Sequence, residues 1–187
     1  MDELLDASLR LCESIEILDE LPTGDRYYLP NQAKDSGRDG LVVRFATGSQ
    51  NEWVGVFAFG EHGKNFPSRV VPLPDSDQVV VVSAGAGYLV HEQVPGSCER
   101  VKSVPVRSVC LVVSHGLLVL ADDTTLVAYG WNGLAWETGR IGWNNVRIRR
   151  VDNSCIHGTT FDIRSDEDVS FSVDARSGAV HGGIEIP

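Results

Sequence analysis

The sequence lacks any hydrophobic run long enough to cross a membrane, and its charge is far from balanced. No stretch approaches the roughly 20 apolar residues that span a bilayer. Among the 187 residues, 16 Lys and Arg stand against 26 Asp and Glu, which gives a formal net charge of −10. Nucleic acids and anionic membranes attract basic residues, so we expect neither as a partner.

The N-terminus lacks the positive charge with which an export signal begins. It opens with MDELLDASLR, which is acidic, so we expect a cytoplasmic protein. The four cysteines form no CxxC motif and no Cys/His pair at zinc spacing; they are Cys12, Cys98, Cys110 and Cys155. In a reducing compartment this pattern predicts four thiols, some of them buried, with a pair of disulfides as the alternative.

Apolar residues are abundant enough for a sizeable core. Hydrophobic residues make up 42% of the chain and charged residues 22%, which is ordinary for a globular protein and too apolar for general disorder. The length fits one domain, or one domain with a small appendage.

Residues 1–40 differ from the rest of the chain in charge. They contain ten acidic and four basic residues, a net charge of −6. An apolar stripe predicts an amphipathic helix over about 2–20, and it consists of Leu4, Leu11, Ile15 and Leu18. The alternative interpretation makes ESIEIL a short strand, and residues 30–40 are typical of a loop. We therefore divide the chain into an acidic N-terminal helix and loop, 1–40, and an all-β domain, 41–187.

From Leu41 onward the chain consists of short Val-rich runs broken by Gly, Pro, Asn and Asp. Such a series indicates a mostly β protein with stacked antiparallel sheets, and it leaves open a sandwich or an incomplete propeller. No helical stretch interrupts it, which argues against a Rossmann-type fold. The expected strands cover residues 41–46, 53–59, 78–83, 87–94, 106–113, 116–121, 125–131, 134–139, 146–151, 155–163 and 168–174.

Residues 116–139 give the clearest local prediction. Asn132-Gly133 is a two-residue hairpin signal, because both turn positions need a positive φ. A turn there pairs Tyr129 with Trp136 and places both rings on one face of the sheet. The other face is also apolar, so we expect a sheet covered on both sides, as in the stacked blades of a propeller or a three-layer arrangement.

Weak internal repetition accompanies these hairpins. The segment TLVAYGWNGLAWETG has an echo in VSFSVDARSGAVHGG, with Gly133 aligned to Gly178 at an offset of 45 residues, which is within the range of propeller blades. The upstream segment AGYLVHEQVPGSCERV gives a third copy when Leu89 is aligned with Leu126.

Residues 115–182 resemble quinoprotein-type β-propeller blades, in which an Asp-rich turn ending in Gly precedes a strand with Trp. Asp174 and Gly178 match this pattern, whereas His181 stands about where that family has its Trp. The resemblance implies blade-like sheets but no cofactor, because a complete quinoprotein propeller is far longer than this chain. The segment WETGRIGWNNVRI resembles small bacterial proteins without an assigned function, which implies a bacterial origin.

Motifs for catalysis and metal binding are missing. The five histidines form no HxH, HxxxH or HExxH motif, so no local metal site is visible. There is no GxSxG motif, and the run around Gly85 is typical of a hairpin rather than a phosphate loop. The acidic clusters fall in expected turns; they are Asp75/Asp77, Asp122/Asp123 and Asp166/Glu167/Asp168. We therefore predict no catalytic residue, no metal ligand and no cofactor.

Aromatic and basic side chains remain as candidate binding residues. Trp131, Trp136 and Trp143 lie within thirteen residues, and they form either a buried core or an exposed platform for sugars or proteins. Trp131, beside the turn, is the one that we expect to be partly exposed. Arg147 and Arg149 alternate with apolar residues, which fits a charged edge strand or an anchor for an acidic partner.

These observations favour a non-catalytic interaction protein, of inhibitor or immunity type, that binds a basic protein by electrostatic steering. The alternative is a small-ligand or carbohydrate-binding β domain that uses Trp131 and Trp143, with Arg147 or Arg149 as the polar anchor. An enzyme is the third hypothesis, and its sign would be a pocket that brings a histidine next to an Asp or Glu.

Overall fold

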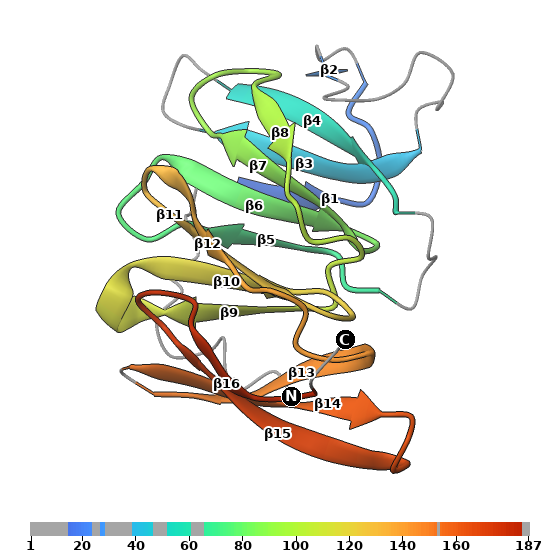
Figure 1. The fold of residues 1–187 in the computed structure, drawn as a ribbon. Coiled ribbons are helices and arrows are strands. Elements are labelled where there is room, and N and C mark those ends of the chain that lie inside the picture. Colours follow the sequence, from blue (N-terminus) through green and yellow to red (C-terminus); the bar gives the residue numbers. More distant parts are fainter. Residues whose placement is uncertain are drawn as a thin grey trace. The chain divides into compact units, whose positions relative to one another are not determined.

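The protein is mostly β. The computed structural model describes residues 15–23, 27–28, 39–46, 52–60, 66–152 and 154–184. Within these ranges, sixteen strands form four four-stranded sheets, and the single helical turn is a 3-10 turn, η1 (Val113–His115) (Figure 1). Over the same ranges, no helix has the length and apolar character needed to cross a membrane.

The chain divides into two compact units. The first contains the described residues of Ser8–Pro72 and Ser76–Lys102, and the second those of Leu73–Asp75 and Ser103–Pro187. The predicted division into 1–40 and 41–187 stays a prediction.

The first unit contains two sheets, and neither is closed. One has the strand order β1-β3-β4-β2, in which only the β2–β4 pair is parallel. The other is an antiparallel meander, β5-β6-β7-β8. The strands are β1 (Ile15–Leu18), β2 (Tyr27–Tyr28), β3 (Gly40–Ala46), β4 (Glu52–Ala58), β5 (Arg69–Pro72), β6 (Gln78–Ser83), β7 (Ala86–His91) and β8 (Cys98–Arg100).

The second unit contains two antiparallel meanders of four strands each. Their strands are β9 (Ser108–Val112), β10 (Leu117–Ala121), β11 (Leu126–Gly130), β12 (Gly133–Glu137), β13 (Asn144–Val151), β14 (Cys155–Asp162), β15 (Glu167–Asp174) and β16 (Val180–Gly182). Each expected strand range overlaps an observed strand, with bounds that differ by up to three residues. The strands that the sequence missed are short: β2, β5, β8 and β16 have two to four residues.

The prediction of an N-terminal helix is wrong for those of its residues that the structure describes. Ile15–Leu18 forms β1, which pairs with β3 through Ile15 and Phe45 at one end. The backbone bonds of β1 are thus made to a neighbouring strand, and tertiary pairing overrides the helical spacing of the apolar residues. The short-strand alternative for ESIEIL is confirmed for its described part, Ile15–Leu18. Residues 2–14, which include Cys12, and the loop residues 30–38 lie outside the described ranges.

The hairpin between β11 and β12 is confirmed, but its turn is shifted by one residue. Gly130 pairs with Gly133, so the turn residues are Trp131 and Asn132. Of these four residues, only Gly133 takes a left-handed φ, at 90°. This conformation suits glycine and would strain a residue with a side chain. The turn therefore places its glycine after the tip and not within it.

The shifted turn and a bulge change the face on which Trp136 lies. Because the register shifts between Ala128 and Tyr129, Trp136 stands opposite Ala128 and not opposite Tyr129. Trp136 and Ala128 belong to the same core cluster, and strand alternation places Tyr129 on the other face. Tyr129 is nevertheless only 5% exposed, so the prediction of a sheet covered on both faces is confirmed.

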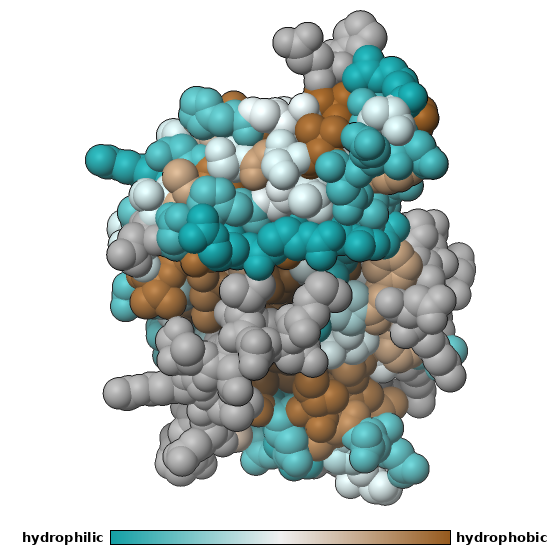
Figure 2. All heavy atoms as spheres, turned by 90° about the horizontal axis from the view of Figure 1, so that it is seen from below, coloured by the Kyte–Doolittle hydropathy of each residue, from teal (hydrophilic) through white to brown (hydrophobic). Residues whose placement is uncertain are grey.

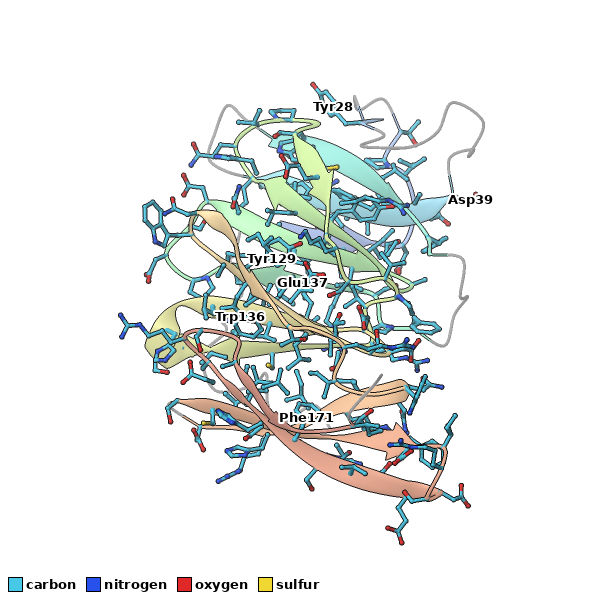
Figure 3. The ribbon with its side chains drawn as sticks, in the orientation of Figure 1. Tyr28, Asp39, Tyr129, Trp136, Glu137 and Phe171 are labelled. Atoms are coloured by element: carbon cyan, nitrogen blue, oxygen red, sulfur yellow. The ribbon has the colours of Figure 1, made fainter. Side chains whose placement is uncertain are left out.

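A docked tryptophan joins the two sheets within each unit. In the second unit, Trp136 on β12 donates its indole N–H to the carbonyl oxygen of Ala175, at 3.0 Å, directly after β15 (Figure 3). Gly178 lies against the same indole, since a Cβ at position 178 would be 2.9 Å from its Cδ2. In the first unit, Trp53 on β4 donates to the carbonyl oxygen of Glu92, at 2.7 Å, directly after β7.

An apolar cluster surrounds each docked tryptophan. In the first unit it contains Val43, Phe45, Trp53, Phe57, Val79, Val81, Ala86, Tyr88 and Val90. In the second unit it contains Cys110, Val112, Leu117, Val119, Ala121, Leu126, Ala128, Trp136, Ile141, Val146, Ile148, Ile156, Phe171, Val173 and Ala175. Both clusters draw side chains from two sheets, so the sheets of each unit share one core.

A substitution at Gly158 tests the packing of the core in the second unit. It stands opposite Phe171, and a Cβ at position 158 would clash with the Phe171 ring and with the carbonyl oxygen of Arg147. We expect Gly158→Ala to lower the free energy of unfolding by roughly 1–3 kcal/mol. Gly139→Ala is the control, because a Cβ at position 139 meets open space, and its effect should stay within about 0.5 kcal/mol. Denaturant unfolding measures both, and equal effects would contradict the packing described.

The buried thiol of Cys110 gives a pH-dependent prediction. Burial raises the pKa of Cys110 to about 12, so alkylating reagents at pH 8 should modify this thiol only after unfolding. A thiol in the unfolded chain ionises at roughly pH 8.5. Ionisation of Cys110 should therefore not change the free energy of unfolding below that pH. Above it, the free energy of unfolding should fall as the pH rises towards the folded pKa of Cys110. Urea unfolding across this range should show a weaker loss for Cys110→Ala than for the unchanged protein.

Candidate functional site

Three exposed apolar side chains lie at one end of sheet β9–β12. Trp131, in the β11–β12 turn, is 68% exposed, as expected, and Leu134 on the edge strand β12 is 44% exposed. Val113, 63% exposed, lies in the β9–β10 turn at the same end, because the strands run alternately up and down. We call Val113, Trp131 and Leu134 the Trp131 patch.

The Trp131 patch can bind through its apolar surface. A large planar ring with few rotatable bonds loses little entropy on binding, and tryptophan is enriched among the residues that dominate interface energies. Figure 2 shows hydrophobic residues in separate places among hydrophilic ones on the face that it draws, so apolar exposure is not confined to one point.

Among the described residues, the ring contacts and hydrogen bonds of Trp143 do not include the residues of the Trp131 patch. The guanidinium of Arg140 covers its ring, with Cζ 5.5 Å from the ring centroid. Its indole nitrogen is buried and meets no acceptor among the described residues. No ring contact within the described ranges joins Trp143 to Trp131. The two tryptophans therefore do not form one stacking platform.

Arg147 and Arg149 lie exposed on β13, the edge strand of sheet β13–β16, where the charged-edge interpretation places them. Arg147 Nε donates to Asn145 Oδ1 at 2.9 Å. Arg149 Nε donates to Thr159 Oγ1 at 3.2 Å, and its Nη2 lies 3.6 Å from Asp168 Oδ2. Both guanidinium groups thus have partners within the sheet, which makes them less available as anchors.

The turns carry their expected acidic residues. Asp122 Oδ1 accepts hydrogen bonds from the backbone N–H groups of Thr124 and Thr125, both at 2.7 Å. Asp75 and Asp166 take left-handed φ angles of 53° and 57°, which aspartate tolerates better than most residues. The structural interpretation of these acids accounts for their positions.

A cluster that sequence reasoning missed lies at the β13–β14 turn. Asp152 Oδ1 accepts hydrogen bonds from the backbone N–H groups of Ser154, at 3.1 Å, and Cys155, at 2.8 Å. Its other oxygen, Oδ2, lies 2.9 Å from His157 Nε2. One donor atom from each of Asp152, Cys155 and His157 lies within 4.8 Å of the other two.

Electrostatics keep the Asp152 carboxyl ionised. The hydrogen bond from His157, followed by the backbone N–H groups of Ser154 and Cys155, lowers the pKa of Asp152 to about 2. Arg150 Nη2 adds a positive charge 3.7 Å from Oδ2. The aspartate–histidine contact has the distance expected of an enzyme's acid–base pair, but it lies in an open turn, with the two side chains 41% and 34% exposed.

A signal for this cluster is present in the sequence as Asp-x-x-Cys-x-His. Residues two apart on a strand point to the same face, so Cys155 and His157 are neighbours on β14. Asp152 joins them because the chain reverses between β13 and β14. A search for histidine pairs and CxxC motifs does not detect this spacing.

Comparison with protein-family models, with curated proteins and with solved structures found no match for this chain. The class that the fold defines is an all-β protein of four-stranded sheets. Its function is therefore inferred from the two surface features above.

The two tryptophans of the β11–β12 hairpin should differ sharply in their effect on stability. Trp136 is 8% exposed with a bonded N–H, so we expect Trp136→Ala to cost about 3–5 kcal/mol of unfolding free energy. Trp131→Ala removes an exposed ring and should change it by less than about 0.5 kcal/mol. Urea unfolding followed by circular dichroism measures both. A large loss for Trp131→Ala would assign that ring to the core.

Proposed function

We propose that this chain is a non-catalytic interaction protein of the bacterial cytoplasm, and that its partner is another protein with a basic surface. The observation that carries the proposal is Trp131, 68% exposed at a hairpin turn beside exposed Leu134. A tryptophan in this position supplies a binding hot spot, because covering it removes a large apolar area from water.

The charge of the chain supports a basic partner. A net charge of −10 on 187 residues creates a field that attracts basic proteins and speeds their association. Glu137 is exposed on the same edge strand as Leu134. Apolar contact at the Trp131 patch would then supply affinity, while the acidic surface supplies steering, as in an inhibitor or immunity-type protein.

We also infer that the sheets are blade-like modules of an incomplete propeller, as the resemblance to quinoprotein-type blades implies. Three of the four sheets are four-stranded meanders, which is the architecture of a propeller blade. The aligned Gly133 and Gly178 both lie where the third and fourth strands of their sheets connect: Gly133 begins β12, and Gly178 precedes β16. Docking of Trp136 against Ala175 and Gly178 supports stacking of successive sheets in the second unit.

The carbohydrate-binding alternative has less support. It needs Trp131 and Trp143 as a platform and Arg147 or Arg149 as the anchor. The Trp143 ring is covered by Arg140, and both arginines are hydrogen-bonded within the sheet. A protein partner needs only the Trp131 patch, which is already exposed.

Affinity capture from native lysate at low and high salt tests the proposal. The unchanged protein should retain one stoichiometric basic protein at low salt and lose much of it at high salt. Trp131→Ala should weaken binding of that protein by roughly 30-fold, the loss that a hot spot of about 2 kcal/mol gives. The matched control is Ile163→Ala, which removes another exposed apolar side chain from the same unit, 61% exposed.

Three results would count against the proposal. They are equal capture by Trp131→Ala and the unchanged protein, equal losses in both variants, or a captured partner indifferent to salt. If no protein is captured and sugars shift the tryptophan fluorescence of the unchanged protein but not of Trp131→Ala, the carbohydrate alternative replaces it.

A further inference from the structure

The β10–β11 turn shows what an aspartate at this position does when all of its hydrogen-bond partners lie within the turn. Asp122 Oδ1 accepts from the N–H groups of Thr124 and Thr125, two and three residues further on. Its Oδ2 accepts from the hydroxyl of Thr125 at 2.7 Å. Both carboxylate oxygens are therefore used within the turn.

The β13–β14 turn repeats the backbone arrangement with different side chains. Asp152 Oδ1 again accepts from the N–H groups two and three residues further on, those of Ser154 and Cys155. Cys155 stands where the other turn has Thr125. Asp152 Oδ2 is therefore directed to His157 Nε2, at 2.9 Å, and a carboxylate oxygen of Asp152 lies within 4.8 Å of the Cys155 thiol. Turn formation explains one oxygen of Asp152 and leaves the meeting of carboxylate, thiol and imidazole unexplained.

We propose that Asp152, Cys155 and His157 form a binding site for a divalent transition metal ion of the zinc type. Carboxylate oxygen, thiolate sulfur and imidazole nitrogen are all zinc ligands, with bond lengths of about 2.0–2.3 Å. Two such ligands on one tetrahedral ion lie roughly 3.4–3.6 Å apart. The three donor atoms already lie within 4.8 Å of one another, so modest side-chain rotations bring them to an ion.

The scaffold holds the ligands in place before the ion binds. The two backbone hydrogen bonds to Oδ1 orient the Asp152 carboxylate, as outer-shell bonds do in metal sites. Cys155 and His157 project from β14, a central strand that pairs with β13 and β15. This sheet position restricts the two side chains to one face.

The donor set also selects the class of ion. A thiolate with an imidazole favours zinc and similar ions over magnesium and calcium, which prefer oxygen ligands. On binding, the thiol proton of Cys155 passes to solvent and the sulfur coordinates as a thiolate. Three protein ligands leave the fourth tetrahedral position to a water molecule.

The positive charge of Arg150 repels a cation at this site. Its guanidinium lies 3.7 Å from Asp152 Oδ2, and its side chain is 65% exposed, so it can turn into solvent when the ion enters. Removing its charge with Arg150→Gln should therefore tighten metal binding, whereas loss of any ligand should weaken it.

Titration of the metal-free, reduced protein with cobalt(II) tests the site, because a cobalt–thiolate bond absorbs by charge transfer. We expect this absorption in the unchanged protein and its loss in Cys155→Ser. His157→Gln and Asp152→Asn each remove a direct ligand and should weaken cobalt(II) binding at least as much as the loss of an outer-shell partner does, roughly 10- to 100-fold. Asp122→Asn alters the matching turn without a thiol or imidazole nearby and should leave binding unchanged. Circular dichroism checks that each variant is folded.

A second measurement needs no variant. Zinc should slow alkylation of Cys155 in the unchanged protein, read for each cysteine by mass spectrometry. Cys110 should stay unmodified with or without zinc, because it is only 2% exposed. The proposal is overturned if millimolar cobalt(II) gives no charge-transfer absorption, if the absorption survives Cys155→Ser, or if zinc leaves alkylation of Cys155 unchanged. None of these results depends on the Trp131 patch.

Discussion

The docking of Trp136 against the neighbouring sheet is the contact on which the second unit depends. A buried indole N–H without an acceptor would be costly, and here the carbonyl oxygen of Ala175 accepts it at 3.0 Å. Gly178 leaves room for the ring, and its left-handed φ of 74° closes the turn that presents this carbonyl. One side chain thus aligns β12 with the β15–β16 turn. Trp53 and Glu92 form the same kind of bond in the first unit.

Both surface features arise where this packing leaves the second unit open to solvent. Trp131 is five residues from Trp136, yet it is exposed, because the chain reverses between them and a bulge turns Trp136 to the inner face. The β13–β14 turn likewise extends past the shared core, so Asp152 and His157 remain partly exposed while Ile156 between Cys155 and His157 is buried. Binding at either place can therefore occur without disturbing the core.

The sequence predicted those features of the fold that depend on neighbouring residues, and it failed for those that depend on pairing between separate strands. Val-rich runs located the longer strands, because their alternation with turn residues is local. The sequence did not predict strand register correctly. Moving the turn from Asn132-Gly133 to Trp131-Asn132, together with a bulge, separated Trp136 from Tyr129, since a shift of one residue reverses the face of every side chain. Likewise, pairing with β3 decided that Ile15–Leu18 is a strand.

For the candidate sites, the sequence by itself determined which side chains are available and how they are spaced. It sufficed to expect Trp131 at the surface and Arg147 and Arg149 on an edge strand, because turns and alternation are properties of neighbouring residues. Only the tertiary structure decided that Trp143 is covered by Arg140 and that the Asp152 carboxylate meets Cys155 and His157. The physical reason is that sequence spacing limits only how far a side chain can reach. The orientation of the side-chain atoms is set by strand pairing and by backbone hydrogen bonds.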